Sequence, residues 1–531
     1  MQKKRFLASS RLSWTVFFIL ILLPIFFYFA YLSVYGVNVP FYDDWEIVSL
    51  MGHFYAGNLK FGRLWAQHNE NRMFIPNLIF IALYRLTAFN VKAAMFAGGL
   101  FLTLSFACLT YIFLKRHSLS WKFVPLAYLF FSLSDPENIL WGFQMAWQLV
   151  SFCFLGSMAC LEESGNSQTA FAVAILFAVL ASFSSLQGLF IWPAGLVYLA
   201  FNDFSLRQKK IWISSALLCG IIYFAGFNFH STGGPPVTYG LIHPLALLKH
   251  LLILLGGTLV FPIQYAKEPF FIARGFAGLF ILGAGALSTV AATMMSKKDK
   301  AFLAPAALGI FAFLFYISVA IGRAGFGPGQ ALSNRYSLYG IFLFVAIYLT
   351  LLETIKISGE KFLFLFRAFS VIVIFQITTS LHWGMSMGRN YFLHNLKSQE
   401  ILINYKIVSP QLISIYLYPR PNEIPSRASI LEKRHLSVFS NWRSRTLLPM
   451  PPALKNLCQK RPVNWLIWRL LSTIYFYRPD LQKKYPPIPS EKDFAREITS
   501  WAAHGAITDD PDRSLLLPWK DQILQINRAL K

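Results

Sequence analysis

Two adjacent carboxylates, Asp43 and Asp44, stand in the segment that follows the first long apolar run of the chain. Neighbouring carboxylates repel each other, so one of them can hold a proton or the two can share a cation. The pair could therefore supply the general base of a catalytic site, with Asp44 as a ligand for a divalent cation such as Mg²⁺ or Mn²⁺. The alternative is a solvated loop in which Asp43 caps a helix.

The same segment continues with a dense run of hydrogen-bonding side chains at positions 66–72. Four of the 13 acidic residues in positions 1–386 fall between residues 43 and 70, so the acids of this apolar region are concentrated in one loop. Polar groups at a membrane interface need hydrogen-bonding partners. We therefore expect this segment to contact a substrate. The residues concerned are Trp45, Gln67, His68, Asn69, Glu70 and Arg72.

A second polar cluster is formed by Arg323 and Arg335, which flank a glycine-rich turn at positions 325–329. Two guanidinium groups could bind a phosphate group, and glycines let the backbone approach an anion closely. Tyr336 follows directly and is expected at the same site. The alternative is that the two arginines only end helices at the level of the lipid headgroups.

A third set consists of Asn138, Trp141, Gln144 and Gln148, which lie three or four positions apart. This spacing predicts that they share one face of a single helix. Polar side chains in an apolar helix are costly unless they face a cavity or a neighbouring helix. Trp141 and Gln144 are therefore predicted to contact the substrate, with packing between helices as the alternative.

These groups must be positioned by membrane helices, because 56% of the 531 residues are hydrophobic and only 14% are charged. A helix needs about 20 apolar residues to cross a bilayer. Apolar runs occur at 14–35, 92–114, 121–134, 139–160, 170–186, 189–202, 211–229, 244–264, 270–294, 301–321, 336–354 and 362–384.

Basic residues beside these runs predict the orientation, because cytoplasmic loops of membrane proteins are rich in Lys and Arg. Four basic groups, near 115–122, 207–210, 297–300 and 356–367, are expected in the cytoplasm. If the N-terminus is also cytoplasmic, all four basic groups can lie in the cytoplasm only if the run at 244–264 is re-entrant or spans the membrane incompletely. The prediction is an all-α polytopic protein of the cell (inner) membrane with about eleven transmembrane helices.

The density of charge divides the chain into two parts. Lys, Arg, Asp and Glu make up about 10% of residues 1–386 but about 23% of residues 387–531. We expect a transmembrane domain at 1–386, with its first extracytoplasmic loop at 36–73, and a soluble, extracytoplasmic helical domain at 387–531. In that second domain, an aromatic run at 464–477 is expected at the membrane surface and an amphipathic helix near 514–524.

The net charge of +24 does not indicate a nucleic-acid partner. Nucleic-acid-binding proteins gather their basic residues on one face or along one helix. Here the Lys and Arg residues stand in small groups between long apolar runs, as expected for the flanks of membrane helices.

The placement of the acidic pair resembles that in the GT-C superfamily of integral membrane glycosyltransferases, which includes the protein O-mannosyltransferases and the aminoarabinose transferases of lipid A. Those enzymes carry Asp-Glu or Asp-Asp early in the first extracytoplasmic loop and a glycine further on, and Asp43-Asp44 and Gly57 are similarly placed. The chain is also similar to a bacterial group of multispanning proteins without an assigned activity. The shared signatures are Asp43-Asp44-Trp45, Ala66-Gln67-His68-Asn69-Glu70, Trp141-Gly142-Phe143-Gln144 and Asn334-Arg335-Tyr336, with Asn334 in place of a serine.

The resemblance implies that a sugar is transferred from a polyprenyl-phosphate carrier to an extracytoplasmic acceptor, with inversion. The acceptor would be a glycan, a lipid or a protein. Asp43 or Asp44 would deprotonate its hydroxyl. Arg323, Arg335 or a divalent cation would meet the charge that develops on the phosphate. The residues implied to orient the sugar or the acceptor are His68, Glu70 and Arg72.

A transporter or a flippase of lipid-linked glycans is the main alternative, and a non-catalytic partner in envelope assembly is another. Transporters tend to place ionisable residues near the bilayer midplane on broken helices. Here the charged residues within apolar runs are few, among them Arg85, Arg274 and Arg367, whereas the acids gather in one loop. This favours chemistry at the membrane surface over a transport path.

Overall fold

The computed structural model describes residues 2–116, 120–165, 167–229, 239–259, 268–403, 405–406 and 410–440. The expected aromatic run at 464–477 and the expected amphipathic helix near 514–524 lie outside the described residues.

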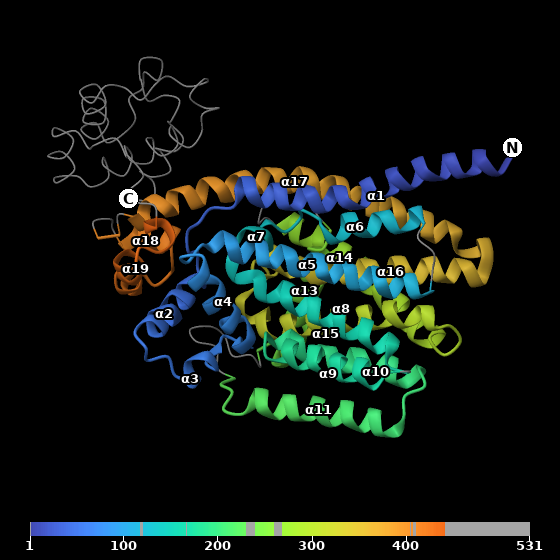
Figure 1. The fold of residues 1–531 in the computed structure, drawn as a ribbon, viewed down its shortest axis with the longest axis horizontal. Coiled ribbons are helices and arrows are strands. Elements are labelled where there is room, and N and C mark those ends of the chain that lie inside the picture. Colours follow the sequence, from blue (N-terminus) through green and yellow to red (C-terminus); the bar gives the residue numbers. More distant parts are fainter. Residues whose placement is uncertain are drawn as a thin grey trace, which may run out of the picture. The chain divides into compact units, whose positions relative to one another are not determined.

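The described part of the chain is built almost entirely from helices (Figure 1). The long helices are α1 (Gln2–Tyr35), α5 (Val91–Arg116), α8 (Met145–Glu163), α14 (Glu268–Met295), α15 (Leu303–Arg323), α16 (Ser337–Ser358) and α17 (Leu363–Ile403). The shorter ones are α2 (Asp44–Tyr55), α3 (Phe61–Leu64), α4 (Phe74–Leu86), α6 (Val124–Phe130), α7 (Pro136–Leu140), α9 (Gln168–Ser182), α10 (Ile191–Phe201), α11 (Leu206–Phe224), α12 (Tyr239–Ile242), α13 (Pro244–Gly256), α18 (Pro410–Tyr416) and α19 (Ile424–Lys433). Two strands of two residues each, β1 (Gln67–His68) and β2 (Asn71–Arg72), form an antiparallel hairpin.

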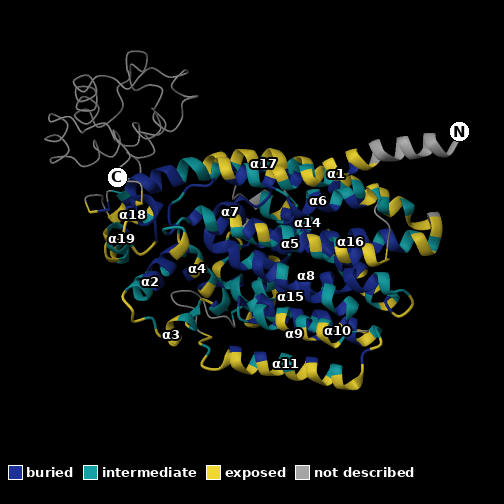
Figure 2. Cartoon of the chain, viewed as in Figure 1, coloured by how far each residue is buried: buried dark blue, intermediate teal, exposed yellow. Residues whose placement is uncertain are grey.

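Seven of the described helical segments are long and apolar enough to cross a membrane. They are Trp14–Tyr35, Val91–Arg116, Gly142–Glu163, Phe270–Met295, Lys300–Phe326, Ser337–Ser358 and Leu363–Ile403. Large apolar side chains remain exposed on the outer sides of α11, α14 and α17, where no other helix covers them (Figure 2). The chain is therefore an all-α, multi-pass membrane protein.

Contacts within the chain group its residues into two compact units. Unit 1 contains Met1–Gly36, Lys60–Ile79 and Ala94–Gly388, and unit 2 contains Val37–Leu59, Phe80–Ala93 and the described residues from Arg389 onward. This grouping differs from the division expected at 386/387 because it adds residues 37–59 and 80–93 to the second part, and its boundary between Gly388 and Arg389 falls inside the continuous helix α17. It also divides the first loop, so that the acidic pair belongs to unit 2 and the polar run at 66–72 to unit 1.

In unit 1, two ion pairs show which ends of the helices α5 and α8 lie side by side. Lys115 at the end of α5 pairs with Glu163 at the end of α8, and Arg116 pairs with Glu162 at 2.6 Å. Because the two helices end side by side, the chain must return between them. It does so through residues 120–134, which contain only the seven-residue helix α6.

The next segments of unit 1 alternate in direction. Helix α9 packs against α8, and α10 returns to the end of α8 at which α11 begins, where Gln208 donates a hydrogen bond to the carbonyl oxygen of Ser164 at 3.4 Å. Helix α11 then leads back to the β1–β2 hairpin, where the carbonyl oxygen of Tyr223 accepts from Arg72. Four passes of the chain are thus made by elements that are not among the seven long apolar segments.

The run at 244–264 does not form a long helix in its described part. A Cβ placed on Gly240, just before α13, would lie 3.0 Å from the carbonyl oxygen of Ile321, near the end of α15. Beyond the other end of α13, the Thr258 hydroxyl lies 3.0 Å from the Tyr316 hydroxyl, also on α15. Both ends of α13 therefore lie against the same end of α15, the arrangement expected of a re-entrant segment.

The prediction that Asn138, Trp141, Gln144 and Gln148 share the face of one helix is wrong. Asn138 lies in α7, Trp141 is extended with φ −122° and ψ 112°, and Gln144 ends a 3₁₀ turn, η2 (Gly142–Gln144). Only Gln148 lies in α8. The chain breaks here because the α7 carbonyl oxygens find other donors: Gln148 Nε2 donates to the carbonyl oxygen of Asn138 at 2.8 Å.

In unit 2, helix α2 packs against α19. Glu46 of α2 accepts hydrogen bonds from the Tyr418 hydroxyl at 2.7 Å and from Arg427 Nη1 at 3.1 Å. Arg427 also lies over the Tyr418 ring, 5.4 Å from its centroid. These contacts explain why residues 37–59 group with the segment after Arg389: an acid of the first loop is paired with a cation near the end of the described chain.

Candidate functional site

The polar run of the first loop forms the β1–β2 hairpin, in which Gln67 pairs with Arg72 and His68 with Asn71. Its two-residue turn requires a left-handed backbone at Asn69, whose φ is 50°. Asparagine tolerates this conformation better than most residues with side chains. The turn places Glu70 at the tip, where its side chain is 41% exposed.

Arg72 holds the hairpin in place. It is 5% exposed, and its guanidinium donates to three backbone carbonyl oxygens: Tyr223 at 3.2 Å, Trp65 at 2.9 Å and Ala225 at 2.8 Å. The Tyr223 hydroxyl in turn donates to the carbonyl oxygen of Glu70 at 2.7 Å. These partners give Arg72 a structural position, although the sequence suggested contact with a substrate.

Two further amide side chains of the hairpin connect it to neighbouring segments. Gln67 Nε2 donates to the carbonyl oxygen of Asn228 at 2.8 Å, and Gln67 Oε1 accepts from the Asn228 N–H at 2.9 Å. Asn71 Oδ1 accepts from the Ser185 hydroxyl at 2.7 Å and from the Leu186 N–H at 3.0 Å. The hairpin therefore fixes both the segment after α11 and the start of η3 (Leu186–Phe190).

A cavity of about 270 Å³ lies in unit 1 beside this hairpin. Its walls combine a carboxylate, a guanidinium, four amide side chains and six aromatic rings. The polar lining residues are Gln67, Asn69, Glu70, Gln187, Asn228 and Arg323, and the aromatic ones are Trp147, Phe227, Phe229, Phe315, Phe326 and Tyr336. Apolar walls with a few convergent polar groups are typical of small-molecule sites.

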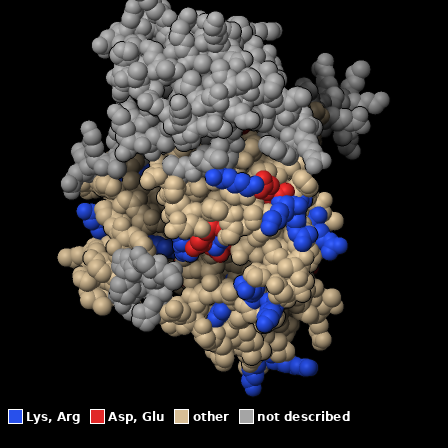
Figure 3. Space-filling model, turned by 90° about the vertical axis from the view of Figure 1, so that its left-hand side faces the viewer, with Lys and Arg blue, Asp and Glu red and all other residues tan. Residues whose placement is uncertain are grey.

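Glu70 and Arg323 form the charged wall of this cavity. Arg323 Nη2 lies 2.6 Å from both carboxylate oxygens of Glu70. Within the described part of the chain, Nε and Nη1 of Arg323 make no hydrogen bond, and its side chain is 20% exposed. Figure 3 shows that acidic side chains on this face of the molecule lie beside basic ones rather than in a patch of their own.

Arg335, the second arginine predicted to bind phosphate, lies outside the cavity that Arg323 lines. Arg335 Nη1 lies 3.3 Å from Glu137 Oε1, and the Ser333 hydroxyl donates to Glu137 Oε2 at 3.2 Å. Arg335 does not line the cavity, whereas its neighbour Tyr336 does. The two arginines therefore do not converge on one described pocket, and each has its own carboxylate partner.

A buried acid lies next to Arg335 and Glu137. Asp135 is 5% exposed, caps α7 through the Asn138 N–H at 3.1 Å and also accepts from the side-chain amide of Asn138. That amide donates as well to the carbonyl oxygen of Arg335 at 2.7 Å. Burial raises the pKa of Asp135 well above its ordinary value, Glu137 raises it further, and the hydrogen bonds from Asn138 oppose this rise.

The two residues of the acidic pair in unit 2, Asp43 and Asp44, differ in burial and in hydrogen bonding. Asp44 is wholly buried, and its Oδ2 accepts from the Phe41 N–H at 3.1 Å. Burial raises the pKa of the Tyr84 phenol, and the Asp44 carboxylate raises it further, so the two groups lie close together. Asp43 is only partly buried and occupies the N-cap position of α2, where its side chain makes no capping hydrogen bond.

Three predicted binding residues are buried away from the described cavity. Trp45 has no exposed surface, and its indole N–H has no hydrogen-bond partner among the described residues. Trp141 is 3% exposed and stacks on Phe143 at 5.9 Å. Gln144 is also 3% exposed. His68 packs against Phe143 at 5.1 Å and is not a lining residue of the cavity.

The described residues contain no group of three or more His, Cys, Asp or Glu side chains that could hold a metal ion. Mg²⁺ usually keeps several water ligands and is bound through one or two carboxylates, whereas Ca²⁺ takes six to eight oxygen ligands. Asp44, the predicted ligand, is wholly buried and accepts a backbone hydrogen bond instead. The role of Asp44 as a ligand of a divalent cation stays a prediction.

Several lining residues were not among the predicted site residues. Gln187 is 6% exposed and accepts from the Ser185 hydroxyl through Oε1, while its Nε2 has no hydrogen-bond partner in the described residues. Trp147 lies on α8 and packs against both Phe315 and Tyr339. The sequence marks Gln187 only as a weak candidate, because Gln187 and Gly188 occupy the gap between the apolar runs at 170–186 and 189–202.

No protein-family model, no curated protein and no solved structure matches this chain.

Proposed function

We propose that the chain is a membrane glycosyltransferase of the GT-C type, which moves a sugar from a polyprenyl-phosphate donor to an extracytoplasmic acceptor with inversion. The acceptor is a glycan, a glycolipid or a protein of the cell envelope. The observation that carries this proposal is the cavity of unit 1, in which Glu70 and Arg323 lie among aromatic rings and amides.

The lining of the cavity is suited to a sugar. Aromatic rings such as Trp147 and Tyr336 can pack against the apolar face of a sugar ring, because they offer large rigid apolar surfaces. The hydroxyl groups of a sugar both donate and accept hydrogen bonds. Gln187 Nε2, which lacks a described partner, supplies a donor, and the exposed Glu70 carboxylate supplies acceptors.

Arg323 is the residue that we assign to the donor phosphate. It is bound to Glu70 through a single nitrogen, so Nε and Nη1 remain to donate to phosphate oxygens. Charge-assisted hydrogen bonds of this kind are about twice as strong as neutral ones. They favour transfer most when they strengthen as the phosphate gains charge on leaving.

Asp43 is the residue that we assign as general base, since Asp44 is wholly buried and bonded to the Phe41 N–H. We base this assignment on the resemblance of the acidic pair to that of GT-C enzymes, and in the proposed reaction this base takes the proton of the acceptor hydroxyl, whose oxygen forms a bond to the anomeric carbon. The bond from that carbon to the phosphate oxygen breaks, and its electron pair leaves with polyprenyl phosphate. One displacement inverts the anomeric centre. No step of this reaction is assigned to a metal ion.

The test compares envelope glycans and glycolipids by mass spectrometry in a deletion strain of the source organism. The strain is complemented with wild type, Asp43→Asn, Arg323→Gln or Asp203→Asn at matched protein levels. General-base catalysis contributes about 10²–10⁴-fold, so Asp43→Asn is expected to abolish one sugar product. Asp203→Asn makes the same chemical change at an exposed site and is expected to restore that product.

Thermal unfolding of each purified variant separates loss of chemistry from loss of folding. If Asp43→Asn and Arg323→Gln both restore the full product, the enzyme assignment fails and a transporter or an assembly partner becomes the better explanation. If Asp43→Asn alone restores it, the base is not Asp43, and the proposed mechanism is wrong.

A further inference from the structure

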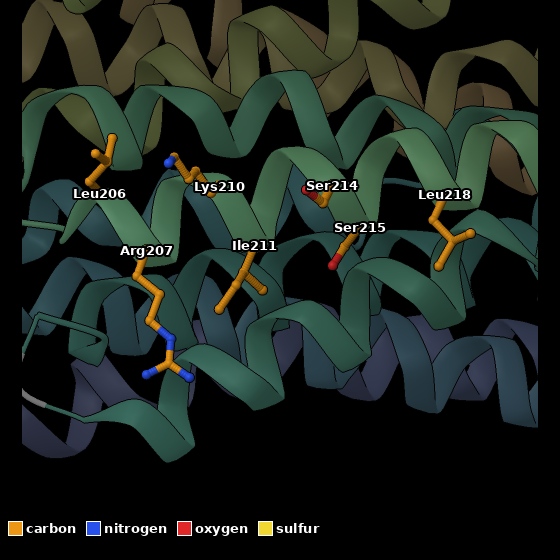
Figure 4. Close-up of a pocket in the computed structure, with 7 residues that line it drawn as sticks. All are labelled: Leu206, Arg207, Lys210, Ile211, Ser214, Ser215 and Leu218. Carbon is orange, nitrogen blue, oxygen red and sulfur yellow. The ribbon is translucent and has the colours of Figure 1, made fainter.

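A second hollow lies in unit 1 along helix α11, far along the helix from the hairpin. It has a volume of about 610 Å³, and all of its lining residues belong to the first two thirds of this one helix (Figure 4). They are Leu206, Arg207, Lys210, Ile211, Ser214, Ser215 and Leu218. We call this hollow the α11 groove.

The groove residues form two neighbouring stripes. Residues four apart lie on the same side of a helix. In Figure 4, Arg207, Ile211 and Ser215 point to one side of α11, and Lys210 and Ser214 point to the other side of the view. Each stripe begins with a cation and continues with apolar or hydroxyl side chains.

The two cations are not neutralised within the described part of the protein. Arg207 and Lys210 are exposed, and neither forms an ion pair with a described residue. A capping box between Ser205 and Gln208 fixes the first turn of the helix that carries them. The α11 groove therefore presents two positive charges from a well-held helix start.

Three other cations at this end of unit 1 have carboxylate partners within the chain. Lys115 and Arg116 pair with Glu163 and Glu162, and Lys356 pairs with Glu353 at 3.1 Å. The chain thus supplies internal carboxylates for the cations of α5 and α16. No described carboxylate of the chain pairs with Arg207 or Lys210 at the α11 groove. A negatively charged group from outside the chain could therefore pair with them.

The length of the groove matches one leaflet of a membrane. From position 207 to position 218 a helix rises about 16 Å at about 1.5 Å per residue. Half of a hydrocarbon core of about 30 Å is about 15 Å. Beyond the cations, Ile211 is 40% exposed and Leu218 57% exposed, with the small side chains of Ser214 and Ser215 between them.

We infer that the α11 groove binds an anionic phospholipid. Its phosphate group lies against Arg207 and Lys210, and one acyl chain runs along Ile211, Ser215 and Leu218. A soluble phosphate would satisfy only the cations and would leave the apolar stripe uncovered. A zwitterionic phospholipid would cover the stripe but would add a positive group beside two cations. This assignment does not depend on the proposed glycosyl transfer.

The experiment measures lipid retention by native mass spectrometry on the purified full-length protein. Phosphatidylglycerol and phosphatidylcholine with identical acyl chains are the probes. The test variant is Arg207→Gln with Lys210→Gln, and the matched control is Lys297→Gln with Lys298→Gln, which removes two exposed cations from another loop. The test variant is expected to retain phosphatidylglycerol about tenfold more weakly than wild type, and the control as strongly as wild type.

Three results would overturn the assignment. Equal losses in both double variants would mean that any surface cation serves. Equal retention of the two lipids by wild type would mean that charge is not recognised. Displacement of the lipid by inorganic phosphate at equal concentration would mean that the ligand is a free anion. Because the four substituted residues are exposed, both variants are expected to unfold at the wild-type temperature, which a thermal melt checks.

Discussion

Arg72 and Arg323 both come from polar clusters that suggested substrate binding, but their surroundings give them different roles. Arg72 is 5% exposed and donates to three backbone carbonyl oxygens. Arg323 is 20% exposed, lines the cavity and contacts Glu70 through one nitrogen only. A guanidinium whose donors are used by the backbone holds structure together, whereas one with remaining donors in a cavity can bind a ligand.

We predict that Arg72→Met lowers stability but not specific activity. The substitution leaves three carbonyl oxygens without their charged donor, and each hydrogen bond to a charged group contributes about 1.5–3 kcal/mol. We expect a loss of about 3 kcal/mol or more in the free energy of unfolding, seen as a lower midpoint in a thermal melt. Arg63→Met, at an exposed position of α3, is the control and should melt like wild type.

The sugar product per folded molecule decides between the two roles of Arg72. If Arg72→Met melts like wild type and yet loses the product, Arg72 contacts the substrate, as the sequence suggested. If it melts earlier and the surviving folded protein still makes the product, the structural role holds.

At the scale of elements, the short 3₁₀ segment η3 positions the cavity wall that carries Leu186 and Gln187. It packs so closely on the end of α9 that a Cβ on Gly188 would overlap the carbonyl oxygen of Ala181. Backbone atoms cannot yield as a flexible side chain can, so only glycine fits here. The apolar pattern of the sequence gives no sign of such a contact.

We predict that Gly188→Ala destabilises the protein and reduces the sugar product. Overpacking of this kind costs about 1–3 kcal/mol, and any shift of η3 also moves Gln187. Gly220→Ala, in the interior of α11, is the matched control, because nothing lies within 4 Å of a Cβ at Gly220. Alanine favours helix over glycine by about 1 kcal/mol, so the control should melt at or above the wild-type temperature. Equal melting of the two variants would contradict the close contact at η3.

At the scale of the whole molecule, the number of membrane crossings depends on whether short segments cross. Seven described helices are long and apolar enough. The passes made by residues 120–134, α9, the η3–α10 segment and α11 would bring the number to eleven, which is the number expected from the sequence. The prediction of about eleven spans therefore requires that these four segments cross the membrane.

A reporter at residue 203, between α10 and α11, distinguishes the two counts. With eleven crossings and a cytoplasmic N-terminus, this loop lies in the cytoplasm, in accord with the basic residues at 207–210. With only the seven long helices crossing, it lies outside. We therefore expect an alkaline phosphatase fusion after Asp203 to be inactive and a fluorescent protein fusion there to be bright.

The control for this topology is a fusion after Ser440. Both counts are odd, so the described end of the chain should lie outside in either case, and phosphatase should be active there. Phosphatase activity after Asp203 would reduce the crossings to the long helices. A cytoplasmic reporter after Ser440 would contradict both counts and the proposed extracytoplasmic site.

The sequence by itself determined that this chain is an all-α membrane protein, because run length and composition decide whether a segment is stable in a bilayer. It also located the polar loop, since clustered acids and amides are visible in any stretch of residues. From these patterns the hairpin at 67–72 and the arginine at 323 could be selected as candidate site residues.

Only the tertiary structure decided how those candidates are used. Two of the three partners of Arg72, Tyr223 and Ala225, lie 151 and 153 positions away, and Glu70 meets Arg323 across 253 positions. The break at Trp141 and the burial of Asp44 likewise depend on contacts with other segments. Hydrogen bonds and close packing act between groups that are near in space, so spacing along the chain cannot reveal which polar residue is satisfied by the backbone and which remains to bind a ligand.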